Sequence, residues 1–347
     1  MYVFQSRTAD EAWCQAESAI LGGASRATSQ ASRAGDTREI LHAVIAIDDP
    51  RQRWVVSRHP ALNPGFAVAE AMVLLAGSNE AAVLNYWFPG LPRFAGDGPT
   101  YHGAYGHRLR HHFGIDQVKQ ACEALTANPD GRQVVLQLWD ARTDLPLADG
   151  RPRSADIPCN VVSILKVRGG LLEWTQVMRS NDLFRGLPYN LVQFTVLHEV
   201  LAGWLGIEVG TYHHWSDSLH AYVAGSQRFS ADADVVAADN SDSLAVDVAQ
   251  GSALIAELFR RMTALTAASI DEREILAIND WGGTPPGYRN LLRVLSAESA
   301  RRRARIELAD ALMVDCTNPA LTQVWSAWRA RNNRRRRGDG ASIGSGI

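Results

Sequence analysis

The sequence has few cysteines, no long apolar segment and no export signal. Its four cysteines include no Cys-x-x-Cys pair, which argues against a disulfide scaffold or a zinc site and predicts that no metal is bound. No apolar run approaches the roughly 20 residues needed to span a bilayer. The N-terminus lacks a basic stretch followed by an apolar one, the pattern of a secretory signal. We therefore expect an intracellular, cytoplasmic protein without membrane partners.

Charge of one sign is also lacking, since the formal net charge of the 347 residues is −2. Lysine is almost absent, with only Lys119 and Lys166, and the basic residues are nearly all arginine. The run Arg334–Arg337 is interpreted as a solvated helix end rather than a ligand site. Nucleic acid is therefore not expected as a partner. With 46% hydrophobic and 21% charged residues, the chain can bury a full core.

Composition and periodicity divide the chain into four parts. We expect a helical N-terminal segment over residues 1–35 and a central domain over 36–250. A helical C-terminal extension follows over 251–335, and residues 336–347 form a Gly/Ser tail that we expect to be disordered.

The central domain mixes predicted strands and helices, which favours an α+β fold. Helices are expected at 66–76, ending at Gly77 and carrying Glu70, at 115–127, and at 191–205, where His198 is interpreted as a hydrogen-bonded core residue. Strands are expected in two runs within 39–57, at 132–140, at 161–168 and 171–178 joined by a Gly-Gly hairpin, and at 208–215 before a polar segment that ends at Tyr222.

Chemically informative residues gather around one cysteine. Cys159 lies in Ile-Pro-Cys-Asn directly before a predicted strand; a lone cysteine is usually a small buried hydrophobe, but its context here is unusual. Three motifs follow it, namely Arg179-Ser180-Asn181-Asp182, Gly186-Leu187-Pro188-Tyr189-Asn190 and His220-Ala221-Tyr222. An Arg-Ser pair suits phosphate oxygens. An asparagine amide offers a donor and an acceptor, which match O4 and N3–H of uracil.

In this order the motifs resemble the thymidylate synthase superfamily, including its pyrimidine hydroxymethylase branch. Cys159, Arg179, Asn190 and His220 follow one another at intervals of 20, 11 and 30 residues, which agree with that family. The resemblance covers roughly residues 50–225. It implies a thymidylate synthase-like catalytic domain, with a mixed β-sheet layered with helices, to which a helical C-terminal extension is added.

The resemblance also implies a mechanism. The Cys159 thiolate adds to C6 of a pyrimidine nucleotide, and the activated C5 then takes a one-carbon unit from 5,10-methylenetetrahydrofolate. A nearby guanidinium such as Arg179 is expected to lower the pKa of the thiol. Glu70 falls where the family places its catalytic glutamate, and its apolar helix is expected to raise its pKa so that it moves protons through water.

Further roles follow only from the resemblance. Tyr105 is the active-site tyrosine, Asn190 reads the base, and Asp182 and Gly186 contact the folate. His220 and Tyr222 hold the sugar hydroxyl. The 5′-phosphate is bound by Arg179 and Ser180, together with Arg132 from the second subunit of a homodimer.

Four departures from the family pattern bear on the last step. Asn160 and Gln133 stand where synthases have histidine and arginine. In synthases a tryptophan shields the one-carbon unit, whereas here the corresponding region holds Leu91, Pro92 and Phe94. The short apolar C-terminal tail of the family is missing as well. A synthase must exclude water so that hydride reduces the intermediate, whereas a hydroxymethylase must admit water. The departures favour 5-hydroxymethylation, with Asn160 as a water anchor, over thymidylate synthesis.

Other readings stay open at this point. A Cys-His hydrolase could pair Cys159 with His213, His214 or His220, and a non-catalytic relative could use the arginine-rich end to bind nucleic acid. The sequence does not decide between ribose and deoxyribose. Asn190 favours uracil without excluding cytosine, and Arg51, Arg53 and Arg58 are equal candidates for a further phosphate contact.

Overall fold

The computed structural model describes residues 1–22, 27–32, 35–224, 229–232 and 234–336, with the backbone alone for 334–336. A mixed sheet has the strand order β1-β3-β9-β7-β6-β5, with β2 paired to β3 and β8 to β9. Its strands are β1 Tyr2–Ser6, β2 Thr28–Gln30, β3 Thr37–Ile47, β5 Val135–Gln137, β6 Asn160–Arg168, β7 Leu171–Met178, β8 Asn181–Asp182 and β9 Glu208–Tyr222; β4 Arg58–His59 and β10 Ser230–Ala231 form a separate pair.

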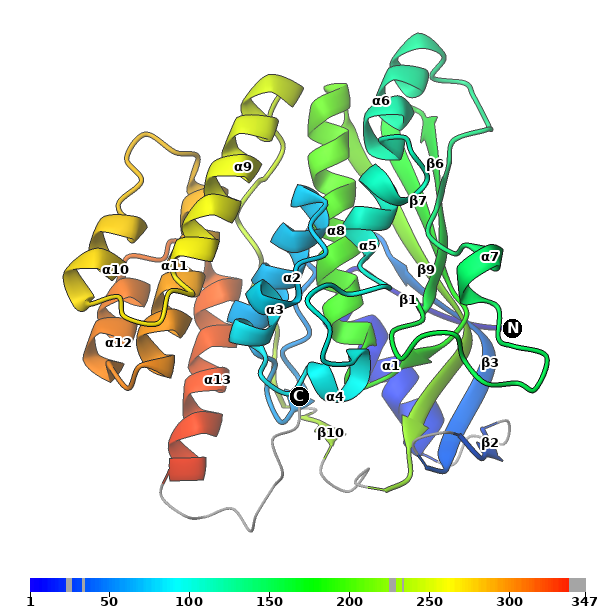
Figure 1. The fold of residues 1–347 in the computed structure, drawn as a ribbon, viewed down its shortest axis with the longest axis horizontal. Helices are drawn as coiled ribbons and strands as arrows, with labels where there is room; N and C mark the ends of the chain where they lie inside the picture. Colours follow the sequence, from blue (N-terminus) through cyan, green and yellow to red (C-terminus); the bar gives the residue numbers. More distant parts are fainter. Residues whose placement is uncertain (23–26, 33–34, 225–228, 233, 337–347) are drawn as a thin grey trace.

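Helices cover this sheet in two layers (Figure 1). The first layer, counted together with the short helices in its connecting loops, consists of α1 Ala9–Leu21, α2 Pro64–Ala76, α3 Ala81–Trp87, α4 Pro92–Ala95, α5 Tyr105–His107, the π-helical turn η1 Arg108–His112, α6 Gln117–Ala127, α7 Ala141–Asp144 and α8 Leu187–Leu205. The second layer holds α9 Val248–Ala264, α10 Glu272–Asn279, α11 Pro286–Arg302, α12 Ile306–Val314 and α13 Pro319–Arg336. The expected α+β fold with a helical extension is confirmed.

Helix α2 belongs to the first layer and is covered by the second, which explains why it is almost wholly apolar. It packs against α8 on one side and against α9, α11 and α13 on the other. A helix surrounded by protein needs no polar face. Asn63 caps its N-terminus by accepting a hydrogen bond from the Phe66 amide, and Gly77 ends it with a φ of 72°, as expected. Glu70 is its one acidic residue, and it is partly exposed.

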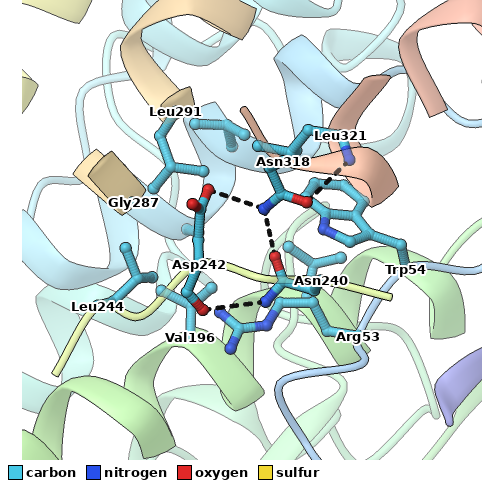
Figure 2. Close-up of a pocket in the computed structure, with 13 residues that line it drawn as sticks. Arg53, Trp54, Val196, Asn240, Asp242, Leu244, Gly287, Leu291, Asn318 and Leu321 are labelled. Atoms are coloured by element: carbon cyan, nitrogen blue, oxygen red, sulfur yellow. Dashed lines mark hydrogen bonds between the residues drawn. The ribbon is translucent and has the colours of Figure 1, made fainter. Parts of the chain in front are cut away.

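The C-terminal extension meets the central domain through buried polar residues beside a small cavity (Figure 2). The Asp242 carboxylate accepts hydrogen bonds from Asn318 at 2.7 Å and from Asn290 at 3.0 Å. Arg331 of α13 donates to the Ala61 carbonyl at 2.7 Å, just before α2. These contacts attach the extension to the segment that leads into α2, so the two layers support the helix together.

Several predicted elements differ in extent from the observed ones. The second strand expected within 39–57 is wrong, because residues 52–57 do not form a strand. Instead the Val56 and Ser57 amides both donate to the Asp10 carboxylate at 2.8 Å. The strand expected at 208–215 continues to Tyr222 because the polar segment pairs with β3. Residues 1–35 contain strands β1 and β2 as well as the expected helix.

Three further expectations concern His198, the C-terminal tail and membrane-spanning segments. His198 is fully buried in α8 and its Nε2 contacts the Leu172 carbonyl, as expected for a core histidine; burial lowers its pKa to about 4. The expected disorder of 336–347 falls almost wholly outside the described residues, as does Arg337. Within the described part of the chain, no helix is both long and apolar enough to cross a membrane.

Candidate active site

A cleft of about 800 Å³, counting space open to solvent, opens between α2, the turn at α5, the segment before β6 and the start of α8. Its lining includes Glu70, Tyr105, Cys159 and Asn190. These four residues are spread over 120 positions of the chain, and the sequence analysis predicted that all of them act in one site. The fold brings them together.

Cys159 is half-buried directly before β6, beside the guanidinium of Arg179. The Arg179 Nη2 lies 3.9 Å from Cys159 Sγ. Arg179 is held there because its Nε donates to the Pro158 carbonyl at 2.9 Å and its Nη2 to the Ile157 carbonyl at 3.1 Å. The backbone of Arg179 also donates to the Cys159 carbonyl at 2.8 Å. A positive charge therefore stands next to the sulfur.

Glu70 reaches the cleft from α2. Its Oε2 atom is buried and has no hydrogen-bond partner among the described residues. Burial raises the pKa of Glu70 to about 8, and a hydrogen bond with Gln193 offsets part of that effect. The carboxyl is therefore mostly protonated at neutral pH, as expected for a proton-transfer group in an apolar helix.

Tyr105 lines the cleft and packs against α8, with its ring centroid 5.7 Å from that of Phe194. Burial raises its pKa well above 10, so its hydroxyl stays protonated. The next residue must be glycine, because a Cβ on Gly106 would lie 2.4 Å from the Leu74 carbonyl oxygen of α2. That close approach brings Tyr105 and Glu70 to the same cleft.

Asn190 lies in the first turn of α8, which begins earlier than predicted because Pro188 fits the first turn of a helix. The side chain is 8% exposed and lines the cleft. Its Nδ2 donates to Asn181 Oδ1 at 3.2 Å. The amide thus has a buried partner on one side and open space on the other.

The structure also shows an acidic group in the cleft that the sequence analysis missed. Asp156 lines the cleft three residues before Cys159, and its Oδ2 accepts a hydrogen bond from the Gly103 amide at 2.7 Å. Burial raises its pKa. Its place next to the Pro-Cys motif was the only sequence signal.

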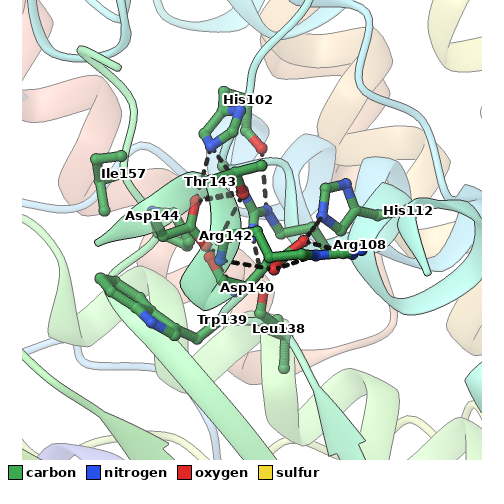
Figure 3. A network of polar contacts seen from close by, with 12 residues as sticks. His102, Arg108, His112, Leu138, Trp139, Asp140, Arg142, Thr143, Asp144 and Ile157 are labelled. Atoms are coloured by element: carbon green, nitrogen blue, oxygen red, sulfur yellow. Dashed lines mark hydrogen bonds and ion pairs between the residues drawn. The ribbon is translucent and has the colours of Figure 1, made fainter. Parts of the chain in front are cut away.

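A buried ion-pair network supports the wall of the cleft and was also missed (Figure 3). Arg108 is fully buried and donates to both oxygens of Asp144, at 2.6 and 2.9 Å. It also donates to the Leu138 carbonyl at 2.7 Å and to the His102 carbonyl at 3.0 Å. The network ties the turn that carries Tyr105 to the loop after β5. No local pattern marks Arg108, because Leu138 and its carboxylate partner Asp144 are 30 and 36 residues away.

Other predicted site residues do not line this cleft. Asn160 is fully buried; its Oδ1 accepts a hydrogen bond from Gln176, and its Nδ2 has no partner among the described residues. Asp182 accepts from the Phe184 and Arg185 amides, each at 2.8 Å. The remaining ones are Arg132, Arg179, Ser180, Gly186, His220 and Tyr222, none of which is part of the cleft lining, although Arg179 lies beside Cys159. Their proposed contacts stay predictions.

The three arginines left open by the sequence are now distinguishable. Arg53 is buried in an ion pair with Glu199. Arg58 is buried too; its Nε donates to the Phe184 carbonyl at 2.6 Å, while its Nη2 has no partner among the described residues. Arg51 is the most exposed, with 40% of its side chain accessible. Arg53 is therefore the least available of the three for a phosphate.

The histidines of a Cys-His hydrolase are not in the cleft. Its lining contains Cys159 but neither His213, His214 nor His220. His214 is instead buried, with its Nε2 2.7 Å from the amide nitrogen of Asn181. In addition, among the described residues no group of three or more His, Cys, Asp or Glu side chains is placed to hold a metal ion.

A mixed sheet layered with helices, with a cysteine in the lining of a cleft and an arginine 3.9 Å from its sulfur, is an α+β architecture suited to nucleophilic chemistry. The thymidylate synthase family model matches residues 36–274, more than half of the chain. The chain belongs to the thymidylate synthase family.

The chain is also similar to several curated proteins. A deoxyuridylate hydroxymethyltransferase of Pseudomonas phage M6 is 38% identical over 175 residues, which cover 50% of this chain and 48% of that protein. A protein of the same name from Bacillus phage SP01 is 34% identical over 205 residues, covering 56% and 52%. A putative thymidylate synthase of Methanothermobacter marburgensis is 36% identical over 118 residues, covering 34% and 50%. The chain thus spans about half the length of these relatives.

Proposed function

We propose that this protein transfers a one-carbon unit from 5,10-methylenetetrahydrofolate to C5 of a uracil nucleotide and leaves a 5-hydroxymethyl group. The observation that carries the proposal is the shared cleft of Cys159, Glu70, Tyr105 and Asn190, with Arg179 beside the sulfur. The names of the two phage relatives support the same reaction.

The cleft suits a folate next to a nucleotide. Beyond Cys159 its walls are formed by apolar and aromatic side chains that fit a flat heterocycle, namely Leu84, Leu91, Ala95 and Tyr101. When bound, the folate supplies a carbon at the oxidation level of formaldehyde.

The first steps use Cys159 and Asn190. The sulfur forms a bond to C6, and the C5–C6 electron pair moves onto the C4 oxygen to give an enolate. Asn190 holds the N3–C4 edge of the base in this step. The protonated Glu70 delivers protons to this edge through water. C5 would then bond to the one-carbon unit, and water would carry the C5 proton away. Breaking the bond between that carbon and the folate nitrogen would release tetrahydrofolate and leave an exocyclic methylene group on C5.

Water completes the reaction. Its oxygen bonds to the methylene carbon, the electrons return to the C4 oxygen, and the released proton is accepted by a carboxylate in the cleft. The enolate then collapses, re-forms the C5–C6 double bond and expels the Cys159 thiolate. Glu70 and Asp156 make this end of the cleft polar, which favours water over hydride.

The product distinguishes the two branches of the family. We expect dUMP and the folate to give a 5-hydroxymethyl nucleotide and tetrahydrofolate, without the absorbance increase of dihydrofolate. Mass spectrometry of the products formed from dUMP, UMP, dCMP and CMP is the measurement, and it also identifies the sugar and the base. A 5-methyl product with one equivalent of dihydrofolate would show that the chain is a thymidylate synthase.

We also propose a homodimer with shared sites. Arg132 is exposed on the turn after α6 and does not line the cleft of its own chain, so it is available to a partner's phosphate site. Mixed subunits carrying Cys159→Ser and Arg132→Ala should recover about a quarter of wild-type activity. Half of randomly mixed dimers are heterodimers, and each of these has one intact site.

The complementation test requires proof that subunits exchange. Native mass spectrometry of the mixture should show the heterodimer, while each variant alone stays inactive. If heterodimers form and activity does not return, Arg132 acts within its own subunit or has no role in the site.

A further inference from the structure

A line of buried side chains stands behind Asn190. The Asn190 Nδ2 donates to Asn181 Oδ1 at 3.2 Å, and the Asn181 Nδ2 lies 2.7 Å from His214 Nε2. The His214 Nδ1 lies 2.9 Å from the Tyr212 hydroxyl. The exposed fraction falls along this line from 8% at Asn190 through 2% at Asn181 to zero at His214 and Tyr212. Water therefore does not compete for these contacts.

The direction of each hydrogen bond follows from the atoms involved. An amide NH₂ can only donate, so His214 Nε2 must accept. Burial lowers the pKa of His214 to about 3, so the ring is neutral and carries its one proton on Nδ1. That proton is donated to the Tyr212 oxygen. The tautomer of His214 thus fixes the orientation of Asn181.

Asn181 in turn fixes the orientation of Asn190. With its Nδ2 facing His214, Asn181 turns its Oδ1 toward Asn190 and accepts a proton from the Asn190 NH₂ group. A Cβ on Gly186 would lie 2.9 Å from this same Oδ1, so glycine leaves room for the contact. The Asn190 carbonyl oxygen is then the atom left to face the base in the cleft.

We propose that Asn181 and His214 are positioning residues that select uracil over cytosine by locking the amide of Asn190. Uracil N3 carries a proton that this carbonyl oxygen accepts, whereas cytosine N3 is itself an acceptor and meets it unfavourably. If Asn190 could rotate freely, it would serve either base. The proposal rests on the proposed function, in which Asn190 reads a pyrimidine.

Equilibrium binding of dUMP and dCMP to the full-length protein, without folate, tests the proposal. In Asn181→Leu the acceptor for Asn190 is lost, and the preference for dUMP should fall roughly tenfold, the worth of one oriented hydrogen bond. Asn181→Asp keeps an oxygen acceptor and should keep the preference. Asn190→Asp changes the base reader itself and should shift the preference toward dCMP. Thr195→Val, a buried polar change in the same helix, is the matched control and should change nothing.

The tautomer gives a second measurement that needs no variant. Long-range ¹H–¹⁵N spectra of the wild-type protein should show His214 protonated on Nδ1. A proton on Nε2, or an unchanged dUMP preference in a folded Asn181→Leu protein, overturns the proposal while leaving the proposed function intact. If the wild-type protein binds neither nucleotide, the proposed function fails and the selection of uracil fails with it.

Discussion

Replacing Cys159 by serine is expected to lower turnover by a factor on the order of 10⁴ or more, as loss of a nucleophile does in other enzymes. A serine hydroxyl is far less acidic than a thiol, so the guanidinium of Arg179 is not enough to make it a nucleophile at C6. The substitution removes no contact of Asn190, so the Kd for dUMP should stay within a few-fold of the wild-type value. Product formation under single-turnover conditions and calorimetric binding of dUMP measure the two quantities.

A trapping experiment provides the control. The wild-type protein should form a denaturation-resistant adduct with 5-fluoro-dUMP and 5,10-methylenetetrahydrofolate, because fluorine at C5 cannot leave as a proton does. Cys122→Ser is the matched variant: this cysteine lies outside the cleft lining, and burial raises its pKa to about 11. It should form the adduct normally. Substantial turnover by Cys159→Ser would refute the role of Cys159 as the nucleophile.

The sequence predicted the cleft residues better than the framework that holds them. Cys159 and Asn190 lie in short motifs whose chemistry is local, and Glu70 is conspicuous because it is a carboxylate in an otherwise apolar helix. Asp10, by contrast, replaces a predicted strand pairing by accepting two amides from residues more than 40 positions away. Arg108 likewise has a role only once its partners are known. Long-range burial of charge has no periodicity that a sequence pattern can show.

The same limit applies to the histidines. From the sequence, His214 was one of three histidines that a Cys-His hydrolase could pair with Cys159. The structure places its ring behind Asn181 and away from the cleft lining. Only the pairing of β8 with β9, which is set by the whole sheet, brings Asn181 to that ring. The effect of a histidine on base choice is thus a property of the tertiary structure.

Glu70 is expected to contribute to activity at the expense of stability. Its pKa is about 8 in the folded protein and 4.5 in an exposed carboxyl. Between these values the unfolded chain is ionised while the folded chain holds the proton, so the free energy of unfolding decreases as the pH rises through this window. Above pH 8 the loss is complete and amounts to a few kcal/mol, on the order of the pKa difference.

Glu70→Gln should therefore raise the thermal stability while it removes activity. At pH 8 we expect its Tm to exceed that of the wild-type protein by several degrees. At pH 5 the two should differ little, because this pH lies at the start of the window and ionisation of the unfolded chain has cost little stability there. Turnover should fall by about 10² to 10⁴, since an amide cannot transfer protons. Glu123→Gln, a change at a side chain that is 63% exposed, is the matched control for both measurements. A Tm difference that does not grow with pH would mean that Glu70 is ionised in the folded protein, and retained turnover would mean that another group moves the proton.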